Sequence, residues 1–260
     1  MKFQDFPTGR FYNEDCFDAM KEIPDGVIDM ILCDLPYGTT QNKWDSVLDL
    51  EKLWKEYWRV AKENAAIVLT ASQPFTSKLL LYQIENFKYE WIWRKNTGSN
   101  FANASRQPLK YHENILVFYR EQCNYNKQPQ IRISKESINR TKYKVQSNAG
   151  NSKSSNYGEF NQLENSVQYD SNNKNPESII DIKSEPNSKG KLHPTQKPVA
   201  LFEYLIKTYT NENELILDNC AGSGTTAIAA INTNRKWVCI EKETEYYDKA
   251  INRIINHGWK

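Results

Sequence analysis

The sequence predicts a doubly wound α/β fold on a mainly parallel β-sheet, and three observations support this. Short apolar runs rich in Ile, Val and aromatic residues recur along the chain, bounded by turn signals. Segments with helical spacing of apolar residues lie between most of them, and this alternation is typical of a parallel sheet covered on both faces. With 260 residues, the chain is long enough to bury such a core.

The strands are predicted from apolar runs of four to eight residues. In chain order these runs are VIDMILC (27–33), AAIVLTA (65–71), YEWIWR (89–94), NILVFYR (114–120), ELILD (214–218) and WVCIE (237–241). Helices are predicted between and after them. These cover 45–62, 75–84, 198–209, 225–232 and 244–255. The first carries Leu53, Trp54 and Tyr57 on one stripe, and the third begins with Pro198 in its first turn, a position that helices tolerate.

Composition excludes several classes of protein. No apolar stretch reaches 18 residues and the N-terminus lacks a hydrophobic signal core, so we expect a cytoplasmic protein with no membrane partner. The five cysteines include no C-x-x-C pair, which argues against a disulfide framework or a cysteine zinc site, and the three scattered histidines indicate no metal. A net charge of +2 is compatible with a nucleic-acid partner but does not by itself indicate one.

The domain organisation follows from a break in this pattern. Residues 1–120 and 193–260 are expected to form two halves of one domain, and 121–192 an insertion dominated by Asn, Ser, Lys, Gln and Tyr. The first part of the insertion is basic and could follow a phosphate backbone. A solvated, low-complexity loop is the alternative.

A glycine-containing turn joins a predicted strand to a helix in ELILDNCAGSGTTAIAA (214–230). Gly222 and Gly224 let the backbone approach a ligand, and the helix N-terminus offers free N–H groups. The turn lacks the features of a triphosphate or dinucleotide loop. Glu241 ends the next strand, 23 residues after Asp218, where an acid can bind ribose hydroxyls. A ligand with a ribose and a carboxylate, S-adenosylmethionine, fits; the alternative is a structural turn and an exposed Glu.

Asp34, Leu35, Pro36 and Tyr37 follow the first predicted buried strand. A carboxylate from Asp34 and the backbone carbonyl of Leu35 could each accept one N–H of an exocyclic amine and keep its lone pair aimed at a methyl donor. Pro36 biases Leu35 toward an extended conformation, and Tyr37 could stack on the base. Such a base must leave its duplex to reach the clamp. Taken alone, the tetrapeptide is better explained as a strand-terminating turn, and only its occurrence together with the glycine-containing turn favours the clamp.

With these motifs the chain resembles the S-adenosylmethionine-dependent DNA amino-methyltransferases of the permuted β group. DLPY (34–37) is similar to their catalytic tetrapeptide, LDNCAGSGTT (217–226) to their cofactor motif, and HPTQKPVAL (193–201) to the segment before it. NEDCFDAM (13–20) and HENILVFYR (112–120) match further segments. The resemblance implies a Rossmann-like catalytic domain in which 121–192 is the target-recognition region.

The resemblance also implies which residues carry the function. The catalytic group is Asp34, Leu35, Pro36 and Tyr37. The cofactor residues are Asp15, Cys16, Asp34, His193, Thr195, Gln196, Lys197, Pro198, Asp218, Asn219, Cys220, Ala221, Gly222, Ser223, Gly224, Thr225 and Glu241, with Lys197 expected at the cofactor carboxylate. The DNA contacts are Arg94, Lys95, Arg106, Lys110, Arg132, Lys135, Arg140, Lys142 and Lys144, or else these are ordinary loop charges.

Two departures from the family pattern stand out. Leu35 replaces the first proline of the tetrapeptide, which leaves the carbonyl intact. Asn219 and Cys220 stand where Pro and Phe are common, so no ring for the cofactor adenine is evident. Asp at the first tetrapeptide position favours methylation of adenine N6 over cytosine N4.

Other activities remain open at this stage. A methyltransferase acting on RNA or on a protein amide would share the clamp, and Leu35 would suit an inactive methyltransferase-like partner that binds DNA. The expected partner is duplex DNA. A cognate restriction endonuclease of a restriction-modification system, a homodimer and the target sequence cannot be decided from these residues.

Overall fold

The computed structural model describes residues 2–38, 45–131, 153–154, 158–159, 172–184 and 196–258. These fall into two compact units, one formed by residues 1–126 and 178–260 and the other by residues 127–177. In the smaller unit, β7 (Gln130–Ile131) pairs with β10 (Asn173–Lys174), and β8 (Lys153–Ser154) pairs with β9 (Gly158–Glu159), both antiparallel. The boundaries 121–192 of the expected target-recognition insertion stay a prediction.

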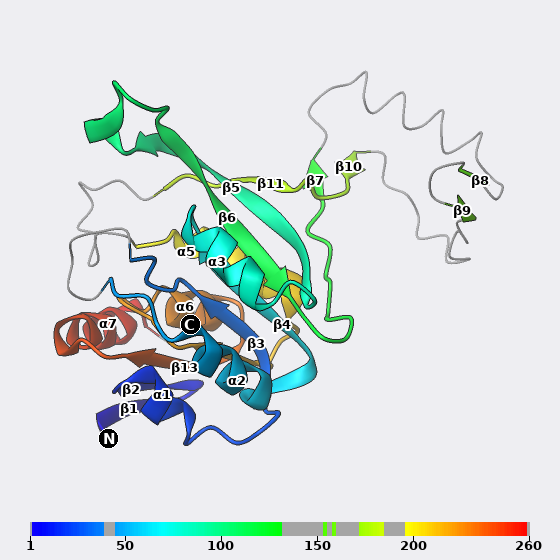
Figure 1. The fold of residues 1–260 in the computed structure, drawn as a ribbon. Helices are drawn as coiled ribbons and strands as arrows, with labels where there is room; N and C mark the ends of the chain where they lie inside the picture. The colour runs from blue at the N-terminus through cyan, green and yellow to red at the C-terminus, as the bar shows by residue number, and fades with distance from the viewer. Residues whose placement is uncertain are drawn as a thin grey trace. The chain divides into compact units, whose positions relative to one another are not determined.

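The larger unit is built on a mixed sheet with the order β1-β2-β13-β12-β3-β4-β6-β5-β11 in the described part of the chain (Figure 1). From β2 through β13, β12 and β3 to β4, neighbouring strands run parallel, whereas β1 and β6 pair antiparallel with their neighbours. The strands are β1 (Lys2–Phe6), β2 (Gly9–Asn13), β3 (Ile28–Cys33), β4 (Ala61–Ala71), β5 (Phe87–Ser99), β6 (Lys110–Phe118), β11 (Ile179–Asp181), β12 (Leu215–Asp218) and β13 (Lys236–Glu241).

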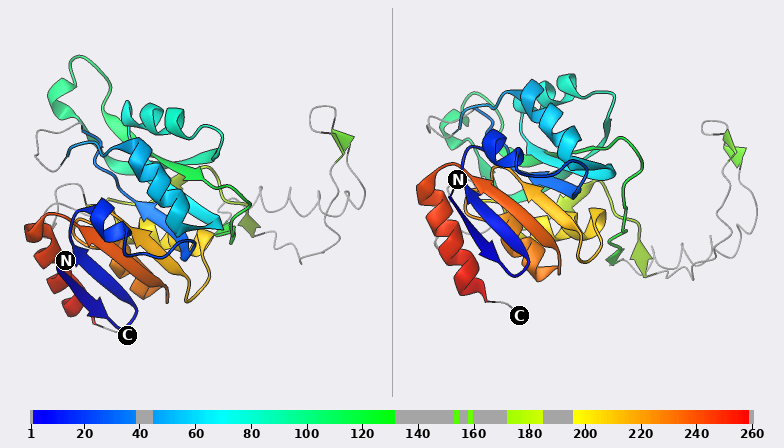
Figure 2. Two further views of the ribbon diagram at one scale, coloured as in Figure 1. Left: turned by 60° about the horizontal axis from the view of Figure 1, so that its bottom comes forward. Right: turned by 90° about the horizontal axis from the view of Figure 1, so that it is seen from below.

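Helices cover both faces of this sheet, as the views in Figure 2 show. One hydrophobic core joins the sheet to α5 (Val199–Tyr209), α6 (Thr225–Asn232) and α7 (Thr244–His257). The other joins it to α1 (Cys16–Met20), α2 (Leu50–Val60) and α3 (Phe75–Tyr82). The doubly wound, mainly parallel fold is therefore confirmed.

The strand β3 shows why the sheet is buried on two sides. Met30 and Leu32 pack into the core under α5 and α6, whereas Ile31 and Cys33 pack into the core under α1 and α2, and all four side chains are fully buried. Side chains alternate between faces along a strand, so a continuous apolar run is needed where both faces are covered. This is the pattern that predicted the strand.

The predicted strands and helices in this unit all form, with boundaries shifted by a few residues. The helix expected at 45–62 begins only at Leu50, because Asp49 caps it and its side chain accepts a hydrogen bond from the backbone N–H of Lys52 at 3.1 Å. The hairpin β1–β2 and the helix α1 were not predicted. β1 is an exposed edge strand with no buried residue, and α1 is too short for helical periodicity to register.

None of the helices in the described residues is long and apolar enough to cross a membrane. The same residues contain no cluster of three or more His, Cys, Asp or Glu side chains arranged to hold a metal ion.

Candidate functional site

Acidic side chains follow four neighbouring parallel strands at the same edge of the sheet. Asp15 comes shortly after β2, Glu241 ends β13, Asp218 ends β12 and Asp34 comes directly after β3. After β12 the chain passes to α6 on one face, and after β3 it passes to α2 on the other. This reversal is a topological switch point, the place where open α/β sheets bind ligands.

A cavity of about 280 Å³ lies over this edge and is lined by all four acids. The four predicted catalytic residues line it as well, together with every predicted cofactor residue in the described part of the chain except Pro198 and Gly224. His193 and Thr195 lie outside the described residues. The fold thus brings the two distant motifs, 34–37 and 218–225, to one cavity.

Gly222 and Gly224 form the turn from β12 into α6 in the left-handed region, with φ of 51° and 76°. Gly224 is the residue that directly precedes α6. A Cβ on it would lie 3.2 Å from the Cβ of Ala250 in α7, so a side chain would add crowding to backbone strain. Gly224 therefore allows the turn to pack against α7 and does not line the cavity.

The two acids beside this turn are bound to its backbone. Asp218 accepts hydrogen bonds from the N–H of Cys220 at 3.1 Å and from the hydroxyl of Thr226. Glu241 accepts hydrogen bonds from the N–H groups of Gly222 and Glu243, each at 2.8 Å. Burial raises the pKa of Asp218 to about 6 and that of Glu241 to about 7, although these hydrogen bonds act in the opposite direction.

Asp34 is held by three donors. Its Oδ1 accepts hydrogen bonds from the hydroxyl of Tyr37 at 2.8 Å and from the hydroxyl of Thr70, at the end of β4. Its Oδ2 accepts a hydrogen bond from the ammonium of Lys197 at 2.7 Å. A carboxylate offers about four acceptor positions, so roughly one remains for a group entering the cavity.

The remaining residues of the tetrapeptide surround this carboxylate. Leu35 is buried, and its side chain packs into the core under α2. The ring of Tyr37 stacks on Phe75 of α3 with centroids 5.5 Å apart and an interplanar angle of 27°. Burial and the charge of Asp34 raise the pKa of Tyr37 well above its usual value, so its hydroxyl stays protonated and can donate to Asp34. Stacking of Tyr37 on a base stays a prediction.

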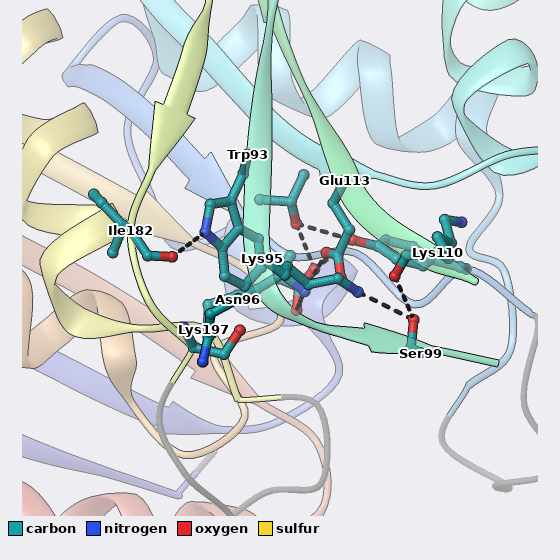
Figure 3. Close-up of polar contacts among 12 residues, drawn as sticks. Trp93, Lys95, Asn96, Ser99, Lys110, Glu113, Ile182 and Lys197 are labelled. Carbon is teal, nitrogen blue, oxygen red and sulfur yellow. Dashed lines mark hydrogen bonds and ion pairs between the residues drawn. The ribbon is translucent and has the colours of Figure 1, made fainter. Parts of the chain in front are cut away.

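Lys197 lies next to Asp34 rather than free in the cavity. Its ammonium, on a side chain only 6% exposed, lies 2.7 Å from Asp34 Oδ2 and 3.2 Å from Glu113 Oε2. Glu113 in turn forms an ion pair with Lys95, whose ammonium is 3.2 Å away. Both side chains are labelled in Figure 3. Lys197 and Lys95 were expected at the cofactor carboxylate and at DNA, and here both ammonium groups are paired inside the protein.

The other predicted DNA contacts differ in exposure. Arg94 is exposed and pairs with Asp181 through two hydrogen bonds. Arg106 is exposed, whereas Lys110 is half-buried and burial lowers its pKa. Arg132, Lys135, Arg140, Lys142 and Lys144 lie outside the described residues.

Sequence reasoning missed several residues of this site. The rings of Phe202 and Tyr246 line the cavity and are candidates for the adenine contact that seemed to lack a ring. Thr70 and Glu113 complete the surroundings of Asp34 and Lys197. Only Thr70 had a usable signal, because it lies near the carboxyl end of a predicted parallel strand, at the same edge as Asp34.

A family model described as DNA methylase, of the N6/N4 methyltransferases, matches residues 28–252. The Type II methyltransferase M.HpaI of Haemophilus parainfluenzae is 26% identical over 91% of this chain and 71% of its own length. The DNA adenine methyltransferase YhdJ of Escherichia coli is 26% identical over 95% of this chain and 85% of its own. The Type II methyltransferase M1.MboII of Moraxella bovis is 27% identical over 95% of this chain and 96% of its own length.

Solved structures share the fold. The crystal structure of M1.HpyAVI with SAM matches with a TM-score of 0.64 at 24% identity, covering 95% of this chain and 98% of that one. The PvuII DNA methyltransferase, described as cytosine-N4-specific, matches with a TM-score of 0.64 at 14% identity, covering 96% of this chain and 91% of that one.

Proposed function

The chain belongs to the N6/N4 DNA methylase family, whose cofactor is S-adenosylmethionine, and on this premise we propose that it methylates the N6 atom of adenine in a short sequence of duplex DNA. The observation that carries the proposal is a single cavity lined both by Asp34, Leu35, Pro36 and Tyr37 and by the glycine turn at 218–225. Methyl transfer requires the amine and the methyl donor to be bound side by side, and this cavity joins the residues proposed to bind each of them.

The geometry around Asp34 suits an amine. One N–H of the flipped base donates to the free acceptor position of Asp34, and the other donates to the carbonyl of Leu35. S-adenosylmethionine, when bound, would supply a methyl group on a sulfonium. The nitrogen lone pair would form the new C–N bond as the C–S bond breaks with its electrons on sulfur, and the nitrogen would release one proton to water. Alignment of the two reactants supplies much of the rate.

The cofactor residues divide by position in the cavity. Glu241, bound to the backbone of the glycine turn, would accept the ribose hydroxyls, and Phe202 or Tyr246 would contact the adenine ring. Asp15 lies near this end, and its carboxylate is 3.1 Å from the ammonium of Lys242. The N-terminus of α6 and Gln196 would face the methionine part, where Gln196 accepts a hydrogen bond from Ser223 at 3.0 Å.

The role of Glu241 predicts a pH dependence of cofactor binding. Hydroxyl donors favour the ionised carboxylate, and burial raises the pKa of Glu241 to about 7. The carboxylate is therefore mostly charged at pH 8 and mostly neutral at pH 6. We expect the dissociation constant of the cofactor to rise about tenfold when the pH is lowered from 8 to 6. Calorimetry of S-adenosylhomocysteine binding at both pH values measures this. The Glu241→Gln variant should bind weakly with a flatter pH profile; an equally steep profile would assign the titration to another group.

Adenine is favoured over cytosine as the acceptor. The adenine methyltransferase YhdJ is 26% identical to this chain in a match that covers 95% of this chain. The cytosine-N4-specific PvuII enzyme matches in fold, with a sequence identity of 14%. The Asp at position 34 points the same way by its resemblance to adenine enzymes. Cytosine N4 is the second candidate, since its exocyclic amine fits the same acceptors.

DNA would contact the hairpin between β5 and β6 and the insertion at 121–192. Residues 96–112 contain no acid, and within them Arg106 is exposed and Lys110 half-exposed, so the hairpin end is positively charged. Lys95 at its base is paired with Glu113, and Arg94 is paired with Asp181, which leaves Arg106 and Lys110 as the better candidates for phosphate contacts among the described residues.

Methylation-aware long-read sequencing of DNA from a methylation-free host that expresses the protein tests the proposal. We expect N6-methyladenine at one short sequence motif, present with the parent protein and absent with an empty vector. N4-methylcytosine instead would keep the clamp and overturn the choice of base. Unmodified DNA from cells that contain folded, cofactor-binding protein would contradict DNA methylation altogether.

A further inference from the structure

Four charged side chains of alternating sign form a chain of contacts that ends at the catalytic carboxylate. Lys95 Nζ lies 3.2 Å from Glu113 Oε1, Glu113 Oε2 lies 3.2 Å from Lys197 Nζ, and Lys197 Nζ lies 2.7 Å from Asp34 Oδ2. Figure 3 shows Lys95 and Glu113 pointing toward each other from β5 and β6. We call these four residues the charge ladder.

Strand register explains how Glu113 and Lys95 meet. Glu113 lies opposite Trp93 in the antiparallel pair of β5 and β6, and Lys95 is two residues further along β5 on the same face. Diagonal neighbours of this kind are within reach of long side chains. The ammonium of Lys95 is also 3.2 Å from the hydroxyl of Ser99, which donates to the carbonyl of Lys110.

The ladder is buried, so its partners depend on one another. The side chains of Lys197, Lys95 and Glu113 are only 6%, 11% and 15% exposed. Burial by itself disfavours the charged form of each group, but the opposite charges outweigh it: the pKa of Lys197 is raised by Asp34 and Glu113, and the pKa of Glu113 is lowered by Lys197 and Lys95. Lys197 and Glu113 are therefore charged at neutral pH.

Two consequences for the reaction follow from the geometry. First, Lys197 occupies one side of Asp34 and thereby directs the remaining acceptor position toward an incoming amine. Second, the methylated nitrogen would be positively charged until it loses its proton. Without a second carboxylate beside it, the ammonium of Lys197 would repel this positive charge. Glu113 balances Lys197, so the ladder as a whole carries no net charge.

We propose that Glu113 is a positioning residue, which holds Lys197 against Asp34 and cancels the charge of its ammonium so that Asp34 can bind the reacting amine. This inference rests on the proposed function of the same cavity. Glu113 acts through Lys197 and touches neither the base nor the cofactor.

The test compares the Glu113→Gln variant with the parent protein and with Glu90→Gln, the same substitution at an exposed position of the neighbouring strand β5. Brief labelling with acetic anhydride, followed by peptide mass spectrometry, reports how well Lys197 is held, whether or not the protein turns over. We expect labelling of Lys197 to rise at least roughly fivefold in Glu113→Gln and to stay at the parent level in Glu90→Gln, because only a released, deprotonated amine reacts.

Kinetics on DNA provide the second measurement. We expect kcat of Glu113→Gln to fall roughly tenfold or more, with KM for S-adenosylmethionine within about twofold of the parent. Loss of Glu113 removes a charge that keeps Lys197 protonated, so kcat of the variant should also decline at alkaline pH where that of the parent does not. Adding Lys95→Met to Glu113→Gln restores a neutral ladder and should recover part of kcat.

The outcomes separate the two proposals. Unchanged labelling of Lys197, or a parental kcat and pH profile in a variant whose parent methylates DNA, would overturn the role of Glu113 and leave the proposed function intact. A parent protein that methylates no DNA would contradict the proposed function, and the labelling result would still decide whether Glu113 holds Lys197.

Discussion

Replacing Asp34 with Ala should reduce methyl transfer far more than cofactor binding, because the other residues that line the cavity still contact the cofactor. The substitution removes the carboxylate that the structure surrounds with the donors Tyr37, Thr70 and Lys197, and with it the acceptor position left for the amine. We expect the single-turnover rate to fall by about 10³-fold or more, because the positioned acceptor acts only on the reacting group. Transfer of a radiolabelled methyl group to DNA measures the rate.

Two further variants make this result specific. Asp34→Asn keeps one acceptor oxygen and should retain more activity than Asp34→Ala. Asp18→Asn changes an exposed carboxylate on α1 whose partner is Lys21, and its rate should equal that of the parent. A parental rate for Asp34→Ala would mean that other atoms hold the amine, and loss of cofactor binding in that variant would point to a collapsed cavity.

The sequence was enough to predict the fold and the meeting of the two motifs, because both follow from local patterns. Apolar runs such as the one at 28–33 are buried on two faces, and together with the helices predicted between them they favour a parallel sheet covered by helices. Once the strands are parallel, residues that follow them, such as Asp34, Asp218 and Glu241, must meet at one edge. Strand order alone then places the two motifs in the same cavity.

What the sequence could not predict depends on tertiary contacts. Glu113 and Lys95 are separated by 18 positions and come together through the pairing of β5 and β6, and Lys197 joins them from a distant segment. A lysine before a helix reads as a surface or ligand charge until its neighbours are known. The same holds for Phe202 and Tyr246, which look like core residues on helices but line the cavity.

Replacing Lys197 with Met should destabilise the protein by about 3 kcal/mol at neutral pH. The substitution leaves the buried carboxylate of Glu113 with Lys95 alone and leaves Asp34 with two hydroxyl donors. Breaking a buried ion pair typically costs about 3–5 kcal/mol, and the lower end applies because Lys95 still pairs with Glu113. Urea unfolding of the parent and the variant measures the difference in the free energy of unfolding.

The pH dependence of this loss identifies the ladder as its cause. The pKa of Glu113 is lowered in the folded protein, so its contribution is present above its ordinary value of 4.5 and is lost as pH falls through the folded pKa. The pKa of Lys197 is raised, so its contribution is complete below its ordinary value of 10.5. The gap between parent and variant should therefore be widest between these values and shrink in acid, as Glu113 is protonated in both proteins.

Adding Glu113→Gln to Lys197→Met should return part of the lost stability, because the double variant no longer buries an underpaired carboxylate. The double-mutant cycle then gives a coupling energy of about 1–3 kcal/mol between the two residues. Additive losses in the cycle, or a gap between parent and Lys197→Met that does not shrink as pH is lowered from 7 to the acid limit of the folded state, would show that Lys197 contributes through packing rather than charge. A large coupling together with a loss of methyl transfer in Glu113→Gln would connect the stability of the ladder to the orientation of Asp34.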